Sequence, residues 1–231
     1  MSKEIIKRKL DIFWFNYARL ESEFTEEILT TAHKAGCKML LWGVESGSNK
    51  VMEDINKGID LNKRDEILRL SRKAGIWNFA FIFFGFPTET TEDAIKTIDY
   101  IKNNTDFISS YGKSMFTFGK HTTLNEHPEK FGITKIYKDD EEFSPRLHFE
   151  TSKGMTKKEL NDISHKCLLE CRKAYNNPLW MYLIYREILF LYICEFGIDK
   201  TEAMSVEQTG NFTDEECANG TVDIWRQSKS L

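Results

Sequence analysis

The chain has 231 residues, of which 41% are hydrophobic and 29% charged, and a formal net charge of −4. This length suits one large domain, or one domain with an appendage. The acidic balance argues against a general nucleic-acid or anionic-membrane binder, because no basic excess exists to neutralise phosphates. The N-terminus lacks an apolar core of signal-peptide length, and the 5 cysteines show no framework spacing. Both features predict a reducing, cytoplasmic setting.

The first 120 residues alternate between strand and helix patterns. The apolar run 12–15 predicts a strand, Thr25 is placed to cap a helix that ends at Gly36, and residues 38–42 predict the next strand. The pattern continues with a short helix capped by Ser46 or Ser48, a helix over 62–74, a strand over 77–84, a helix capped by Thr90 and a strand over 114–118. Such alternation predicts an α/β fold with parallel strands, and its spacing fits a barrel or a doubly wound sheet equally.

A weak internal repeat supports this reading of the first half. Lys34-Ala35-Gly36 precedes one apolar strand and Lys73-Ala74-Gly75 precedes the next. Each time the predicted order is helix, Lys-Ala-Gly, apolar strand and glycine-bearing loop. Two equivalent units favour a repeated right-handed crossover.

The pattern changes after residue 120. Residues 120–155 carry charged runs and predict loop, and a helix is expected over 156–175. The apolar stretch 179–196 predicts a buried or dimer-forming helix rather than a membrane span, because Arg186 and Glu187 at its centre are costly in hydrocarbon. We therefore expect a barrel-like unit over 1–135, a mostly helical extension over 136–205 and a disordered tail over 206–231.

Two glycine-bearing loops follow the predicted strands, where parallel α/β folds bind ligands. In Gly43-Val44-Glu45-Ser46-Gly47-Ser48, the small residues allow a ligand to approach the backbone, and Glu45 could accept bonds from ribose hydroxyls or a ligand ammonium. Capping of the following helix by Glu45 is an equally good interpretation.

The second loop is Gly85-Phe86-Pro87-Thr88-Glu89-Thr90. Pro87 stiffens it, and Phe86 with exposed backbone groups could grip an adenine-like ring. Taken alone, an ordinary turn in which Thr90 caps the helix and Glu89 stabilises its start is the favoured interpretation. Arg19 could pair with a ligand carboxylate, although a plain surface arginine is commoner.

No metal site is predicted. His121, His127 and Glu126 match no strong ligand pattern, and Cys167 and Cys171 share a predicted helix face but lack further ligands nearby.

The stretch from Asp11 to Gly132 resembles the radical S-adenosylmethionine (SAM) superfamily, especially its cobalamin-binding-domain branch. The ordered matches are Ala18-Arg19, Ala35-Gly36-Cys37, the two glycine-bearing loops, Asn56-Lys57-Gly58 and Gly75-Ile76. The resemblance implies a partial (β/α)6 barrel. It implies that Glu45, Ser46 and Gly47 contact the ribose or methionyl part of SAM, that Gly85, Phe86 and Pro87 contact the adenine, and that Arg19 lies near the methionyl carboxylate or the substrate. It also makes Thr117–Pro128 the final barrel strand and its loop.

The sequence departs from this family in one large respect. The family holds a [4Fe–4S] cluster with a Cys-x3-Cys-x2-Cys loop, which is absent here: after Cys167 and Cys171, position 174 is Ala. We therefore expect the C-terminal portion of a longer enzyme, with the cluster loop and any cobalamin domain upstream, that performs radical-based modification or methyl transfer. The alternative is a degenerate, non-catalytic SAM-binding or interaction module. An exposed first-strand edge predicts self-association, and no feature identifies the substrate.

Overall fold

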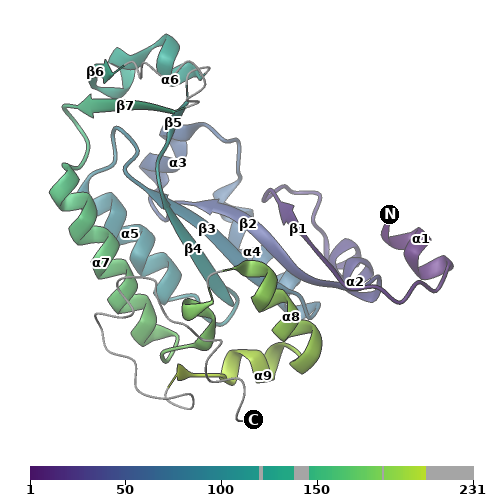
Figure 1. Ribbon diagram of the computed structural model, residues 1–231. Coiled ribbons are helices and arrows are strands. Elements are labelled where there is room, and N and C mark those ends of the chain that lie inside the picture. Colours follow the sequence, from purple (N-terminus) through teal and green to yellow (C-terminus); the bar gives the residue numbers. More distant parts are fainter. Residues whose placement is uncertain (120–121, 138–145, 184, 207–231) are drawn as a thin grey trace.

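The computed structural model describes residues 1–119, 122–137, 146–183 and 185–206. Its centre is a four-stranded sheet in the order β1-β2-β3-β4, and every neighbouring pair is parallel (Figure 1). The strands are β1 (Trp14–Ala18), β2 (Cys37–Glu45), β3 (Trp77–Phe84) and β4 (Ser110–Met115). The predicted α/β fold with parallel strands is confirmed.

Helices connect these strands, as parallel pairing requires. They are α2 (Glu26–Lys34), α3 (Asn49–Ile55), α4 (Leu61–Lys73) and α5 (Thr91–Lys102). Thr25 caps α2 by accepting a bond from the amide of Ile28, and Thr90 forms a capping box with Asp93 at the start of α5. The residues predicted as caps therefore begin these two helices.

The central sheet is covered on both faces. On one face, Asn78 of β3 donates to the carbonyl oxygen of Leu68 in α4 at 2.7 Å. On the other, the guanidinium of Arg186 lies 5.3 Å from the ring centroid of Phe81. Because side chains three apart on a strand point to opposite faces, α4 and the helix that carries Arg186, α8 (Arg186–Phe196), lie on opposite sides. Burial on both faces explains why β3 is almost wholly apolar.

A second, antiparallel sheet follows the first and corrects the prediction of loop over 120–155. Its strands lie in the order β5-β7-β6, with β5 (Phe118–Gly119), β6 (Ile133–Tyr137) and β7 (Arg146–Thr151). The short helices α6 (Thr123–Glu126) and η1 (Pro128–Phe131) lie between β5 and β6. Phe118 and Ile133 form a small separate core. Few apolar residues hold this sheet together, so its hydrophobic pattern is weak in the sequence.

The C-terminal part is helical, and α1 (Ser2–Lys7) precedes the sheet. The helix predicted over 156–175 is α7 (Lys157–Ala174), capped by Thr156. The apolar stretch 179–196 is not one helix: η2 (Leu179–Tyr182) and α8 are separate, and α9 (Ile198–Ala203) follows. Within the described part of the chain, no helix is long and apolar enough to cross a membrane.

Two strand predictions were displaced. The first strand spans 14–18 rather than 12–15, because Ile12 and Phe13 are exposed and pairing begins at Trp14. The fourth spans 110–115 rather than 114–118, so Thr117–Pro128 is not the final parallel strand with its loop. Phe118 instead pairs antiparallel with β7. The expected domain boundaries stay a prediction, and residues 207–231 of the expected tail lie outside the described residues.

Candidate functional site

The carboxyl ends of β1, β2 and β3 carry the residues that the sequence singled out. Because the strands are parallel, their carboxyl ends lie along one edge of the sheet. Arg19 directly follows β1, Glu45 ends β2 and Gly85 directly follows β3. The fold therefore places the two glycine-bearing loops at the ends of neighbouring strands.

Glu45 lies at an irregularity of the sheet. Gly43 pairs with Phe81 and Glu45 with Ile82, so β2 has one extra residue opposite β3. Glu45 has a φ of 67°, in the left-handed region that non-glycine residues seldom adopt. A bulge bends a strand and re-aims its side chains, and bulges are common beside binding and catalytic sites. The irregular backbone thus aims the Glu45 carboxylate at the strand end.

The Glu45 carboxylate has a cationic partner. Lys57 Nζ forms an ion pair with Glu45 Oε1, and Arg19 Nη2 donates to the carbonyl oxygen of Lys57. A Cβ atom on Gly43 would lie 2.6 Å from Glu45 Oε1 and 3.0 Å from Lys57 Nζ, so glycine leaves the space that this pair occupies. The structure therefore brings Arg19 and Glu45 into one cluster through Lys57. Glu45 does not cap the helix that follows.

Ser46 and Gly47 face the protein interior. Ser46 Oγ lies 2.8 Å from Thr97 Oγ1 of α5, and the amide of Gly47 donates to that same oxygen at 2.9 Å. A Cβ atom on Gly47 would lie 2.5 Å from the carbonyl oxygen of Lys96, so only glycine fits against α5. These two residues anchor the loop that carries Glu45.

Ser48 occupies the position before α3, but its side chain makes no capping bond. Its hydroxyl donates instead to Asp93 Oδ1 of α5 at 2.7 Å. Ser48 therefore holds the N-cap position that the sequence predicted for it. Its hydroxyl, however, ties the loop to α5 and does not cap α3.

The second loop is held at several points. Gly85 has a φ of 90°, and Phe86 is buried with its ring centroid 5.0 Å from that of Phe116 and 5.9 Å from that of Phe131. The carbonyl oxygen of Pro87 accepts a bond from Thr151 Oγ1 at 2.7 Å. Phe86 therefore belongs to an aromatic cluster that fixes the loop, and the predicted adenine contact would have to come from the loop backbone or the ring edge.

Glu89 has a larger role than its sequence context suggested. It is fully buried, and its Oε2 accepts a bond from the Gly85 amide at 2.5 Å. Its Oε1 has no hydrogen-bond partner among the described residues. Burial raises the pKa of this carboxyl to about 7, against the bonds from the Gly85 and Phe86 amides, which lower it. The Glu89 side chain thus joins the end of the second loop to its beginning at Gly85. Its place before Thr90 suggested only a stabilised helix start.

A cleft of about 740 Å³ opens beside the second loop. Its walls include the loop at Gly85 and Phe86, the end of β4 at Ser114, the face of β7 at Glu150 and the start of α7 at Lys157. This volume lies within the range of small-molecule sites. A ligand bound here would touch the Gly85–Phe86 backbone.

The four cysteines with described positions do not fit an iron–sulfur cluster. Cys37, Cys167 and Cys171 are buried, and Cys194 is half-buried. Among the residues with described positions, no group of three or more His, Cys, Asp and Glu side chains could hold a metal ion. The strand-end residues, by contrast, offer a carboxylate, backbone groups and a cleft, which suit a polar small molecule.

Comparisons with known proteins agree with the resemblance. Residues 3–101 match the family described as the Radical SAM superfamily. This segment contains both glycine-bearing loops, Arg19 and Lys57.

Two curated relatives match over part of their length. An uncharacterized methyltransferase of Pyrococcus horikoshii is 30% identical over 102 residues, which are 44% of this chain and 22% of that protein. A provisionally named methylthiotransferase of Methanocaldococcus jannaschii is 32% identical over 76 residues, which are 33% of this chain and 17% of that protein. The chain thus matches about a fifth of the length of these relatives.

Solved structures share the fold at low sequence identity. The radical SAM methyltransferase TsrM from Kitasatospora setae, with cobalamin and a [4Fe–4S] cluster bound, has a TM-score of 0.50 and 21% identity over 60% of this chain and 30% of its own. The cobalamin-dependent SAM radical enzyme OxsB has a TM-score of 0.53 and 13% identity over 87% of this chain and 35% of its own. These likenesses support the same arrangement of parallel strands and helices.

Proposed function

Because residues 3–101 match the Radical SAM superfamily, we propose that the carboxyl edge of the parallel sheet is the SAM-facing part of a radical SAM active site. In this proposal Glu45 accepts hydrogen bonds from the ribose hydroxyls or from the methionyl ammonium of SAM. Gly85, Phe86 and Pro87 border the adenine, and Arg19 lies near the methionyl carboxylate or the substrate. The observation that carries the proposal is the bulge that aims the Glu45 carboxylate at the strand end.

The contacts around Glu45 are compatible with a ligand that carries both charges of an amino acid. A carboxylate offers about four lone-pair sites, and among the described residues the Lys57 ammonium is the partner of the Glu45 side chain. Lys57 shows that a cation is stable at this position, so a ligand ammonium could share or replace it. Arg19 is half-exposed, and its Nε pairs with Glu21 Oε1 at 3.3 Å while its Nη2 donates to the carbonyl oxygen of Lys57. A guanidinium has five N–H donors, so these two contacts leave donors for a ligand carboxylate. Ser46 and Gly47 act in this proposal by holding the loop against α5.

The reaction of the whole protein is a further part of the proposal. A [4Fe–4S] cluster would have to be held by residues outside this chain, because the cysteines described here do not suit one. A cobalamin domain would also lie outside it. Radical-based modification and methyl transfer both agree with the relatives' names. What this chain supplies is the binding and orientation of SAM and the exclusion of water.

Calorimetric titration with SAM tests the proposal. We expect Glu45→Ala to weaken SAM binding by roughly tenfold or more, because it removes a charge-assisted acceptor. Glu66→Ala is the matched control, since Glu66 is an exposed glutamate of α4. Equal SAM affinity of Glu45→Ala and the unaltered chain would remove Glu45 from the site.

The second candidate is a non-catalytic SAM-binding or interaction module, which the burial of three of the described cysteines favours. Iron and sulfide reconstitution of this chain joined to a Cys-x3-Cys-x2-Cys segment separates the two. SAM cleavage by the joined protein supports the enzyme. A loaded cluster without SAM cleavage supports the module.

A further inference from the structure

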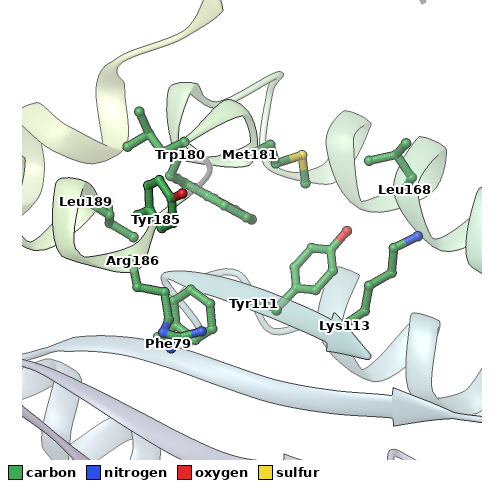
Figure 2. A pocket seen from close by; sticks show the side chains of 11 residues that line it. Phe79, Tyr111, Lys113, Leu168, Trp180, Met181, Tyr185, Arg186 and Leu189 are labelled. Carbon is green, nitrogen blue, oxygen red and sulfur yellow. The ribbon is translucent and has the colours of Figure 1, made fainter. Parts of the chain in front are cut away.

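A second cavity lies away from the strand ends. It encloses about 270 Å³ between the free edge of β4, η2 and the start of α8 (Figure 2). Its walls include Phe79, Tyr111, Lys113, Trp180, Arg186 and Leu189. Phe79 lies five residues before the end of β3, which places it about 16 Å from the carboxyl edge at the usual rise along a strand. The cavity shares no described lining residue with the cleft beside the second loop.

The Arg186 guanidinium has unused hydrogen-bonding capacity in this cavity. Its Nη2 donates to the hydroxyl of Tyr17 at 2.8 Å. The Cζ atom of Arg186 lies 5.3 Å from the ring centroid of Phe81. Its Nε is buried and has no hydrogen-bond partner among the described residues. Leaving a charged donor buried and unpaired is costly. A carboxylate in the cavity that paired with the guanidinium would compensate this charge.

Lys113 supplies a second cation on the wall. Its Nζ donates to the carbonyl oxygen of Ser164 at 2.6 Å and to the hydroxyl of that residue at 2.7 Å. An ammonium has three donors, so these two bonds leave one. Burial lowers the pKa of Lys113, which indicates that its present surroundings only partly compensate the charge. None of the described residues that line the cavity is acidic.

The rest of the wall is aromatic and aliphatic. Trp180 packs edge-on to Tyr111 with ring centroids 5.7 Å apart, and Figure 2 shows Trp180 and Met181 across the cavity from Tyr111. An aromatic wall of this kind favours a ligand with a flat apolar body. Cations with unused hydrogen-bond donors favour a ligand that also carries a carboxylate. A cavity of this size holds a ligand of about ten non-hydrogen atoms.

We propose that this cavity binds a small amphipathic carboxylate, with its apolar body packed against the Tyr111–Trp180 pair and its carboxylate on Arg186. The ligand class follows from the two cations, the lack of an acid on the described wall and the aromatic lining. The proposal does not rest on SAM binding, because it uses only residues that line this cavity and none that line the cleft beside the second loop.

A matched series of probes tests the charge requirement on the unaltered chain. 3-Phenylpropanoate, 3-phenylpropanamide and 3-phenylpropylammonium share one body and differ in charge. Calorimetry should show the carboxylate binding roughly tenfold or more tightly than the amide, and no measurable binding of the ammonium. Equal affinity for the three, tighter binding of the ammonium, or no binding of the carboxylate would overturn the proposal.

Two variants then locate the carboxylate. Arg186→Gln should lower the affinity for 3-phenylpropanoate to that for the amide. Arg69→Gln is the control, since Arg69 is exposed and pairs with Asp106 on the surface, and it should leave both affinities unchanged. Unaltered binding by a folded Arg186→Gln variant would refute the assignment. Should Arg186→Gln fail to fold, the probe series on the unaltered chain still decides the proposal.

Discussion

Alanine at Gly47 or Gly43 separates two roles of glycine in one loop. At Gly47 the added Cβ would lie 2.5 Å from the carbonyl oxygen of Lys96, 2.7 Å from Tyr100 Cβ and 2.8 Å from Thr97 Cα. All three atoms are fixed in α5, so the loop or the helix must shift. Overpacking of this kind costs about 1–3 kcal/mol. With three fixed contacts, we expect Gly47→Ala to cost about 3 kcal/mol, at the upper end of this range. For a chain of this size, that lowers Tm by about 6–12 °C.

At Gly43 the added Cβ meets only the ends of flexible side chains. The nearest atoms are Glu45 Oε1 at 2.6 Å and Lys57 Nζ at 3.0 Å, and both can swing aside. We therefore expect Gly43→Ala to change the free energy of unfolding by less than about 1 kcal/mol. The Glu45–Lys57 pair would be displaced, so SAM affinity should fall although the fold is retained.

Thermal unfolding by circular dichroism and calorimetric titration with SAM, applied to both variants, give the comparison. The expected pattern is a large loss of Tm for Gly47→Ala, and a loss of SAM affinity without loss of Tm for Gly43→Ala. Equal Tm values for Gly47→Ala and the unaltered chain would refute the packing argument. Unchanged SAM affinity of Gly43→Ala would show that the Glu45–Lys57 pair lies outside the binding site.

Three further predictions concern stability. The folded-state pKa of Glu89, about 7, lies above its ordinary value of 4.5, so the chain should lose stability as pH rises from about 4.5 to 7. Urea unfolding at pH 5 and pH 8 measures this change in the free energy of unfolding, and Glu89→Gln should reduce it by up to about 3 kcal/mol. An equal change between the two pH values in Glu89→Gln and the unaltered chain would contradict the argument. Asn78 accepts from Trp42 Nε1 at 2.8 Å and donates to two carbonyls, so Asn78→Leu should cost about 3 kcal/mol or more in the same assay, and a loss below 1 kcal/mol would refute its role. Thr156→Ala removes the capping box with Glu159 and should cost about 1 kcal/mol, with faster amide exchange in the first turn of α7 as the check; unchanged exchange there would contradict it.

The sequence predicted the central elements because they obey local rules. β3 is a continuous apolar run buried on both faces, and Thr25, Thr90 and Thr156 precede helices with acidic residues in their first turn. β4 was misplaced because it begins with a buried serine, Ser110, which directly follows a second one, Ser109. Ser110 Oγ accepts a bond from Trp77 Nε1 at 2.7 Å, and only this tertiary contact makes a polar residue stable there.

Only part of the candidate site could be predicted from the sequence. The order of residues in the sequence placed Glu45 and Gly85 at strand ends. Parallel pairing then predicted that both lie at the same edge of the sheet. The inward direction of Ser46 and Gly47 depends on Thr97, about fifty residues away, and no local pattern indicates it. The partnership of Lys57 with Glu45 and the back-bonding of Glu89 to Gly85 likewise depend on how the loops close.

Hydrogen–deuterium exchange with and without SAM tests the central claim most directly. If the carboxyl edge of the sheet faces SAM, amide exchange should slow in two separate segments, 43–48 and 85–90, while exchange in β6 stays unchanged. Slower exchange only in β6 or the C-terminal helices, or equal exchange throughout at SAM concentrations that saturate a calorimetric titration, would contradict the account.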